Sequence, residues 1–478
     1  MADPGLQQRL KEDVGFREPP ITTVVRPFQE FFRIEASSGI LLLLCTGVAL
    51  FLANSPWAEA YFHFWETELA VTLGDFHISM ELLHWINDGL MAVFFFLVGL
   101  EIKREILIGE LSSPRKAILP IFAAIGGMLL PAIIYLVINW QGPGQRGWGI
   151  PMATDIAFAL GVLAILGKRV PTSLKVFLTA LAIVDDLGAV VVIAIFYTEG
   201  LVWGWLALGI VVFGGMLLLN RLGVRHPVPY GALGIALWFA FLQSGVHATV
   251  AGVLGAMAIP AVARINTGQF VSWSRQALDE LEACCGTTHG NGRGTATTIE
   301  QRAVLQAMET AIQNVESPLQ RMEHALEKPV AYTIMPIFAL ANAGVPFLGN
   351  FFEDLLNPVS VGVVMGLVFG KQIGITVFTW LAVRLGLADL PQGVSWRHIY
   401  GVAWLGGIGF TMALFIDSLA FEGNPLIDTA KIGILTGSII SGVVGYLILR
   451  TAPPVAEAVV ESEPYPQQVR EAQPAQSA

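Results

Sequence analysis

The sequence FLTALAIVDDLGAVVVIAIFY, residues 177–197, decides the fold class. About 20 consecutive apolar residues are enough for a helix to cross the hydrocarbon core of a bilayer. Two adjacent carboxylates, Asp185 and Asp186, lie at the middle of this stretch. An ionisable group at that depth costs about 2.5 to 3.5 kcal/mol, and such groups are functional by default. The stretch therefore predicts a membrane protein and marks a candidate for its functional site.

The composition of the whole chain agrees with this prediction. Of 478 residues, 54% are hydrophobic and only 13% are charged, about half the charged share of soluble proteins. This excludes an ordinary soluble enzyme and predicts an all-α polytopic membrane protein. The net charge is −10, and the sequence has no basic patch with interleaved aromatic residues, so we expect no nucleic-acid partner.

Twelve apolar segments have spanning length: 37–53, 84–106, 117–139, 148–166, 172–197, 201–220, 228–243, 246–264, 330–349, 357–384, 399–420 and 428–450. Of the 27 Lys and Arg residues, all except Arg146, Lys371 and Lys431 then fall on the side of the termini. Because basic residues concentrate in cytoplasmic loops, both termini are expected in the cytoplasm.

The chain divides into two blocks of spans and three other segments. We expect a cytoplasmic arm with an interfacial helix, a small β-hairpin around a Gly-Asp turn in the outer loop, and a disordered tail. We also expect a helical cytoplasmic loop, because its apolar residues recur alternately three and four positions apart in a heptad pattern, which is interrupted at Ser317 and Pro318. The corresponding ranges are 1–36 for the arm, 37–264 for spans one to eight with the hairpin near 69–79, 265–329 for the enlarged loop, 330–450 for spans nine to twelve and 451–478 for the tail.

Four midplane charges define the candidate site. Asp155 in span four and Lys371 in span ten lie at the same depth as Asp185 and Asp186. An ion pair that only joins helices needs one acid per base, but here three acids accompany one lysine. Successive helical residues point about 100° apart, so one of Asp185 and Asp186 can face Lys371 while the other faces a cavity. Carboxylates suit a proton or Na⁺, and no cofactor is expected.

Spans four and eleven are predicted to be discontinuous. PMATDIAFALG (151–161) and WLGGIGFTMALF (404–415) break their apolar runs with Pro, Thr or clustered Gly. Such breaks expose carbonyls and helix ends at the midplane, although small-residue packing between helices is the alternative. Spans three to five and ten to twelve enter from opposite sides with the broken helix central in each triplet, which predicts an inverted-topology repeat. Asp155 and Lys371 would compensate the helix dipoles.

Several motifs together resemble the bacterial NhaA family of sodium/proton antiporters: HWINDGLMAVFFFLVGLEIKREI (84–106), ATDIAFALGVLAILGKRVP (153–171), FLTALAIVDDLGAVVVIAIFY (177–197), SGVHATVAGV (244–253), IFALANAGV (337–345), FGKQIGI (369–375) and GIGFTMALFI (407–416). The resemblance covers about 28–450 apart from an insertion near 268–320. Inverted repeats with discontinuous helices are already established for this family, so the resemblance implies them here.

The resemblance implies an electrogenic antiporter of the bacterial inner membrane that expels one Na⁺ or Li⁺ in exchange for two entering protons, for pH and sodium homeostasis. It also implies a homodimer that forms through the outer loop 54–83, with membrane lipid as a further partner. Asp186 would be the main Na⁺ ligand, and Asp185 would assist it or pair with Lys371. Thr154 and Asp155 match the extended stretch of the broken fourth helix.

Six further positions match family residues tied to the cation entrance or the pH response: Asp88, Glu101, Glu105, His247, Glu323 and His324. Ordinary caps, ion pairs and solvated faces are the alternatives, and for His247 a packing role is favoured. Asp417 departs from the small apolar residue that is usual in the family, and we expect it near a water boundary rather than at an extra proton site.

Two other function classes are weaker. An intramembrane aspartyl protease needs two aspartates on facing helices, whereas Asp185 and Asp186 are adjacent. A passive cation channel needs no proton-binding carboxylates beside a membrane lysine. The sequence therefore favours a transporter over an enzyme.

Overall fold

The computed structural model describes residues 37–73, 76–198, 200–263, 265–286, 299–347 and 351–452. The predicted arm 1–36 and nearly all of the predicted tail 451–478 lie outside these ranges. The described chain is mainly helical, because backbone groups that leave water in long apolar segments must form hydrogen bonds within the segment. Within the same ranges, the one sheet is a two-stranded hairpin.

Six helical segments of the described chain are long and apolar enough to cross a membrane: α7 (Pro114–Ile138), η3 with α8 (Gln145–Met152 and Ile156–Leu166), α9 (Thr172–Phe196), α10 (Trp203–Arg221), α18 with η6 and α19 (Pro358–Met365, Gly366–Gly370 and Lys371–Arg384), and α22 (Leu426–Arg450). Two bent pairs raise the number to as many as eight: α3 (Ser37–Ala53) with α4 (Ala58–Trp65), and α20 (Trp396–Leu405) with α21 (Phe410–Ala420).

The other predicted spans contain helices that do not meet this measure: η1 with α6 (Trp85–Leu90 and Met91–Ile108), α11 (Pro227–Ser244), α12 (Ala248–Ala258), and η5 with α16 (Val330–Ile334 and Met335–Asn342). Short helices lie between the longer segments: η2 (Glu110–Ser112), η4 (Gly167–Arg169) and α17 (Phe351–Leu356). The count of twelve spans therefore stays a prediction.

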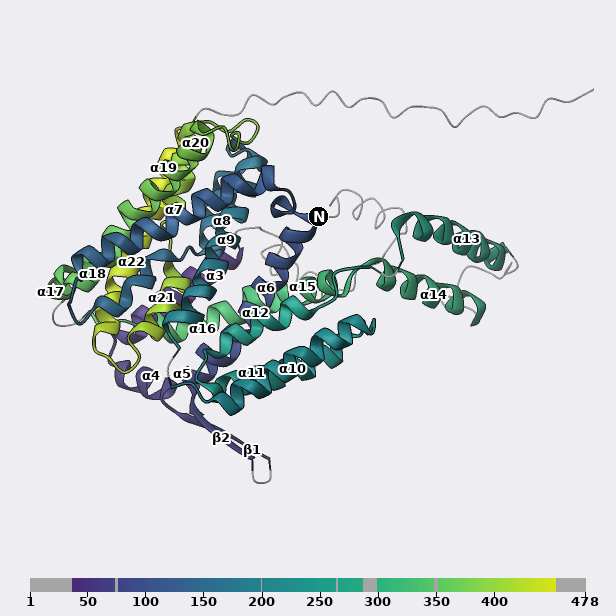
Figure 1. Cartoon of the computed structure of the whole chain (residues 1–478), viewed down its shortest axis with the longest axis horizontal. Coiled ribbons are helices and arrows are strands. Elements are labelled where there is room, and N and C mark those ends of the chain that lie inside the picture. Colours follow the sequence, from purple (N-terminus) through teal and green to yellow (C-terminus); the bar gives the residue numbers. More distant parts are fainter. Residues whose placement is uncertain are drawn as a thin grey trace, which may run out of the picture.

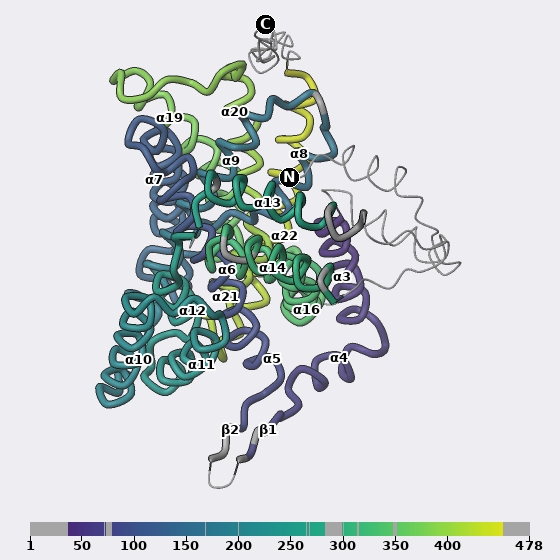
Figure 2. The backbone as a smooth tube through the Cα atoms, turned by 90° about the vertical axis from the view of Figure 1, so that its right-hand side faces the viewer, coloured from purple at the N-terminus to yellow at the C-terminus, as the bar shows by residue number. Residues whose placement is uncertain are grey.

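The hairpin extends from one end of the molecule. Strands β1 (Glu68–Leu73) and β2 (Phe76–Glu81) pair antiparallel, and α5 (Leu82–His84) follows them. Figures 1 and 2 both place the strands at the end opposite α19 and α20, and we call it the hairpin end. The hairpin lies where the Gly-Asp turn predicted one.

Glycines allow α7 and α19 to pack closely. A Cβ on Gly126 would lie 2.3 Å from the carbonyl oxygen of Gly374, and a Cβ on Gly374 would lie 2.1 Å from that of Gly126. Any larger residue at either position would therefore push the helices apart. This contact lies one turn from Lys371 and helps to set the depth of its side chain.

Both predicted broken helices are present. In the first, η3 ends at Met152 and α8 begins at Ile156, with an extended stretch between them. In the second, α20 ends at Leu405 and α21 begins at Phe410, and their axes differ by 44°. The two interruptions touch, because the Asp155 amide donates to the carbonyl of Ile408 over 2.6 Å. The crossing therefore lies inside the main core.

The enlarged loop forms helices α13 (Thr267–Gly286), α14 (Ile299–Val315) and α15 (Pro318–Pro329). Helices α13 and α14 pack together and project from the rest of the chain (Figure 1). Ser317 caps α15 through a capping box. Leu319 in α15 is buried in a core with α6, α10, α11 and α12, whereas Leu305 and Ile312 in α14 are exposed. Only the part of the heptad pattern after Ser317 packs onto the spanning helices.

Candidate functional site

Helix α9 carries Asp185 and Asp186 into the protein interior. Their side chains are almost fully buried, with exposures of 1% and 2%. Because they are adjacent on a regular helix, they point in different directions. Asp185 Oδ2 lies 2.5 Å from Nζ of Lys371, which is itself completely buried. The predicted division of the pair is present in this geometry: one aspartate faces the lysine and the other does not.

Lys371 joins α9 to both broken helices. Its ammonium also donates to the Thr154 hydroxyl over 2.9 Å, and that hydroxyl donates to the carbonyl of Gly406 over 2.8 Å. Gly406 directly follows α20, so its carbonyl belongs to the negative end of that helix dipole. The lysine therefore lies where one acid and the carboxyl ends of η3 and α20 provide negative charge.

Asp155 lies on the other side of the crossing, at the amino ends of α8 and α21. Its Oδ1 accepts the amide of Phe158 over 3.1 Å and caps α8, while its Oδ2 accepts the amide of Thr411 over 3.1 Å in the first turn of α21. The Thr411 hydroxyl also donates to Oδ2. One carboxylate thus serves the amino ends of two helices, whose positive dipole ends stabilise its charge.

Asp186 remains available to a ligand. Its buried Oδ1 has no hydrogen-bond partner among the described residues. The charged groups within electrostatic reach include three acids, Asp185, Glu101 and Asp155, and one base, Lys371. A buried carboxylate oxygen without a partner is costly. Binding a proton or a hard cation such as Na⁺ removes that cost, because both suit carboxylate oxygen.

The six peripheral residues form two groups. His247 caps α12, and its Nε2 lies 3.3 Å from Asp88 Oδ1. Arg104 contacts Glu105 over 2.9 Å and also Glu323, with Glu101 within electrostatic reach. Burial raises the pKa of Glu323, and Arg104 opposes this effect. His324 is exposed. Glu323 is buried instead of lying on a solvated face, because α15 packs against the end of α6.

Two features of the site go beyond the sequence analysis. The side chain of Asp417 is completely buried in α21, although the exposed Glu422 follows only five residues later. Hydropathy does not report this burial, which arises because η3 and α22 pack against α21. Thr411 lies in the motif GIGFTMALFI but carries no signal of its own as a site residue. Its contact with Asp155 joins residues 256 positions apart.

Comparison with known proteins identifies the family of the chain. The family model described as Na⁺/H⁺ antiporter 1 matches residues 29–449. The chain belongs to this family. The Na⁺/H⁺ antiporter NhaA of Oleidesulfovibrio alaskensis is 53% identical over 91% of this chain and 96% of its own length. NhaA 1 of Saccharophagus degradans is 49% identical over 90% of this chain and 93% of its own length.

Membership of the antiporter family confirms three predictions. The chain is a membrane transporter that exchanges sodium ions and protons, and it is not an enzyme. Sodium is the substrate, and antiporters of this family have no cofactor. Within the described ranges, no group of three or more His, Cys, Asp or Glu residues could hold a resident metal. The buried carboxylates of the antiporter are therefore candidates for binding the transported ions.

Proposed function

We propose that Na⁺ and protons compete for one site, formed by Asp186 and assisted by Asp185. The observation that carries this proposal is the unpartnered Oδ1 of Asp186 beside a second buried aspartate. Protonation neutralises a carboxylate, and Na⁺ compensates its charge, so each ligand removes the reason for the other to bind. This competition couples the two fluxes without any covalent chemistry.

Lys371 and Thr154 give Asp185 a different role. Oδ2 of Asp185 is held by the lysine at 2.5 Å, whereas its Oδ1, like Oδ1 of Asp186, has no hydrogen-bond partner among the described residues and can assist Asp186 in holding Na⁺. We propose that the pair contributes the second exchanged proton and Asp186 the first. Two protons for one Na⁺ would move one net positive charge in each cycle, which makes exchange electrogenic. Li⁺, a smaller hard cation, would use the same oxygen ligands.

The architecture we propose has twelve spans and two inverted triplets. The first triplet comprises α7, η3 with α8, and α9, and the second comprises α18 with α19, α20 with α21, and α22. Support comes from the broken central member of each triplet and from the contact between the interruptions. A rigid-body movement of these triplets against α6 and α10 to α12 would expose Asp186 to one side at a time.

The proposed orientation places the hairpin end outside the cell. Arg104, Arg169 and Arg450 lie where their helices end away from the hairpin, and the side chain of Arg169 donates to the carbonyl of Arg450 over 3.0 Å. Basic residues favour the cytoplasmic side, so this end would face the cytoplasm of a bacterial inner membrane, with both termini there. Exposed apolar residues such as Trp203 and Val211 on α10 would contact lipid.

Two further assignments complete the proposal. The loop 54–83 would join two copies into a homodimer, because β1 and β2 project from the body and present free strand edges (Figure 1). Asp88 with His247, at the hairpin end, would serve the cation pathway or the pH response. Glu101, Glu105, Glu323 and His324 would serve the pH response around Arg104. Together these residues would adjust exchange for pH and sodium homeostasis.

The test is sodium-dependent proton movement in proteoliposomes. In the wild-type protein, an imposed Na⁺ gradient should drive protons in the direction opposite to the sodium flux. Imposing a membrane potential should change the rate if exchange is electrogenic. Asp186→Asn should abolish exchange, whereas Asp389→Asn, the same change at an exposed loop position, should leave it intact. Sodium flux without proton movement indicates a channel and contradicts the proposal. Full exchange in Asp186→Asn removes that residue from the site.

A further inference from the structure

A second buried acid lies apart from the exchange site. Asp417 is on α21, six residues beyond Thr411, which places it about 9 Å further along the helix axis and about 240° around it. Its side chain has no exposed surface, and both of its carboxylate oxygens lack a hydrogen-bond partner among the described residues. Asp417 is thus neither a helix cap nor part of the crossing formed by Asp155 and Thr411.

The charged and titratable groups that face Asp417 come from three helices. Lys431 and Asp428 on α22 lie within its electrostatic reach. So do the phenol groups of Tyr135 on α7 and Tyr197 on α9. Helix α16, which also packs against α21, has the sequence MPIFALAN and therefore no titratable side chain. Segment η3 also packs against α21 and carries Arg146, which lies within electrostatic reach of Tyr197. Among the described residues, Lys431 is the cation that acts on Asp417 itself, and the acid within reach, Asp428, is half-exposed.

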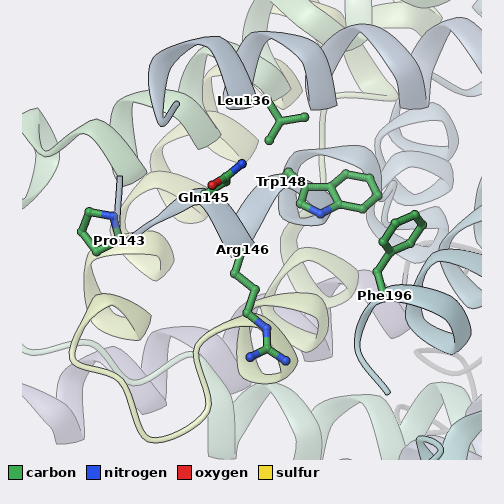
Figure 3. Close-up of a pocket in the computed structure, with 6 residues that line it drawn as sticks. All are labelled: Leu136, Pro143, Gln145, Arg146, Trp148 and Phe196. Atoms are coloured by element: carbon green, nitrogen blue, oxygen red, sulfur yellow. The ribbon is translucent and has the colours of Figure 1, made fainter. Parts of the chain in front are cut away.

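The two tyrosines within electrostatic reach of Asp417 are chain neighbours of residues that line a surface pocket. Their hydroxyls donate to backbone carbonyls at the start of η3: Tyr135 to Gly144 over 2.8 Å and Tyr197 to Arg146 over 2.9 Å. The pocket is lined by Leu136, Pro143, Gln145, Arg146, Trp148 and Phe196 (Figure 3). Leu136 and Phe196 are the chain neighbours of Tyr135 and Tyr197. The pocket therefore lies at the same ends of α7 and α9 as the two phenols that are within electrostatic reach of Asp417.

An ionised Asp417 would be an uncompensated buried charge. Lys431 does not hydrogen bond to it: its ammonium lies 3.8 Å from the half-exposed Asp428. A carboxylate without hydrogen bonds inside a protein costs several kcal/mol, and a proton on one oxygen removes most of that cost. Sodium is a poorer occupant, because it needs several oxygen ligands and would lie near the like charge of Lys431.

We propose that Asp417 is a second proton-binding site, which holds a proton in this conformation, with Lys431 as the cation that stabilises the carboxylate after the proton leaves. The bond that forms on protonation is O–H on one Asp417 oxygen, and water in the η3 pocket takes up the proton on release. This site is independent of the proposed competition at Asp186. A test by spectroscopy can therefore fail or succeed whether or not exchange follows the shared-site mechanism.

Infrared difference spectra of the purified full-length protein test the proposal. At neutral pH, Asp417→Asn should remove the carbonyl stretch of one protonated carboxylic acid, while Asp428→Asn should not. In Lys431→Met, the band should persist to higher pH than in the wild type, because the carboxylate loses its cation. Asparagine has the shape of the neutral acid, so the variant should fold, with unchanged thermal stability.

Three outcomes would overturn the proposal. If Asp417→Asn removes no acid band at any pH at which the wild type is folded, Asp417 is ionised and holds no proton. If the band titrates identically in the wild type and in Lys431→Met, Lys431 is not the stabilising cation. A large loss of thermal stability in Asp417→Asn would also contradict it, since that loss is expected only where an ionised Asp417 is paired with Lys431.

Discussion

Replacing Lys371 by alanine should strongly destabilise the antiporter. Lys371 and Asp185 are both completely buried, with 2.5 Å between Nζ and Oδ2. Removing one partner of a buried pair leaves the other charge uncompensated, which costs about 3 to 5 kcal/mol. The Thr154 hydroxyl also loses its contact with the ammonium. We therefore expect Lys371→Ala to lower the folded-to-unfolded ratio by at least about a hundredfold, since about 1.4 kcal/mol is a factor of ten.

A double-mutant cycle separates the charge from the loss of packing. Replacing both partners, as in Lys371→Met with Asp185→Asn, removes the pair without stranding a charge, so most of the lost stability should return. The assay is thermal unfolding of the detergent-solubilised protein by intrinsic fluorescence. Lys116→Ala is the matched control, because its pair with Glu110 is exposed and worth about 0 to 1 kcal/mol. Equal melting of Lys371→Ala and the wild type would refute the buried pair.

Three further predictions concern the periphery. Deleting 268–315 with a short linker should leave exchange intact and shift its pH profile, because α13 and α14 project away from the site; loss of exchange in a stable, inserted deletant would contradict this. Removing 68–81 should give active monomers in mild detergent, and a persisting dimer would place the interface elsewhere. Burial raises the pKa of Glu323, so its protonated form favours the docked position of α15. Docking should therefore weaken as the pH rises from about 4.5, the ordinary pKa of a glutamate, through the raised pKa of the docked form. Hydrogen exchange of α15 measures this, and in Glu323→Gln it should lose that pH dependence; an unchanged dependence would assign the effect to another group.

Sequence reasoning located the main partners at the site because charges in an apolar segment are conspicuous. Position within the predicted spans was enough to place four charges at one depth: Asp155, Asp185, Asp186 and Lys371. The rotation of about 100° per helical residue required the two adjacent aspartates to point in different directions. Pro, Thr or clustered Gly residues within the apolar sequence marked both helix interruptions. These features need no knowledge of packing, since the cost of a membrane charge depends on depth more than on its neighbours.

The remaining features depend on contacts between distant segments. Thr411 contacts Asp155 only because two interruptions cross, and no periodicity reports such a crossing. Asp417 is completely buried because η3 and α22 pack against α21, and no pattern in the sequence reports this packing. The exposure of Leu305 also depends on packing: the apolar spacing predicted a helix, but it does not report that α14 pairs with α13 and projects from the rest of the chain.

Proton release on sodium addition tests the shared-site mechanism most directly. Measured in weakly buffered detergent solution at several pH values, apparent sodium affinity should rise with pH and level off once the site is deprotonated. Sodium binding should release protons with the same coupling factor, as thermodynamic linkage requires. Asp186→Asn should abolish the release while keeping the wild-type fold, and Asp389→Asn should preserve it. A sodium affinity that does not depend on pH, or proton release that persists in Asp186→Asn, would contradict competition at Asp186.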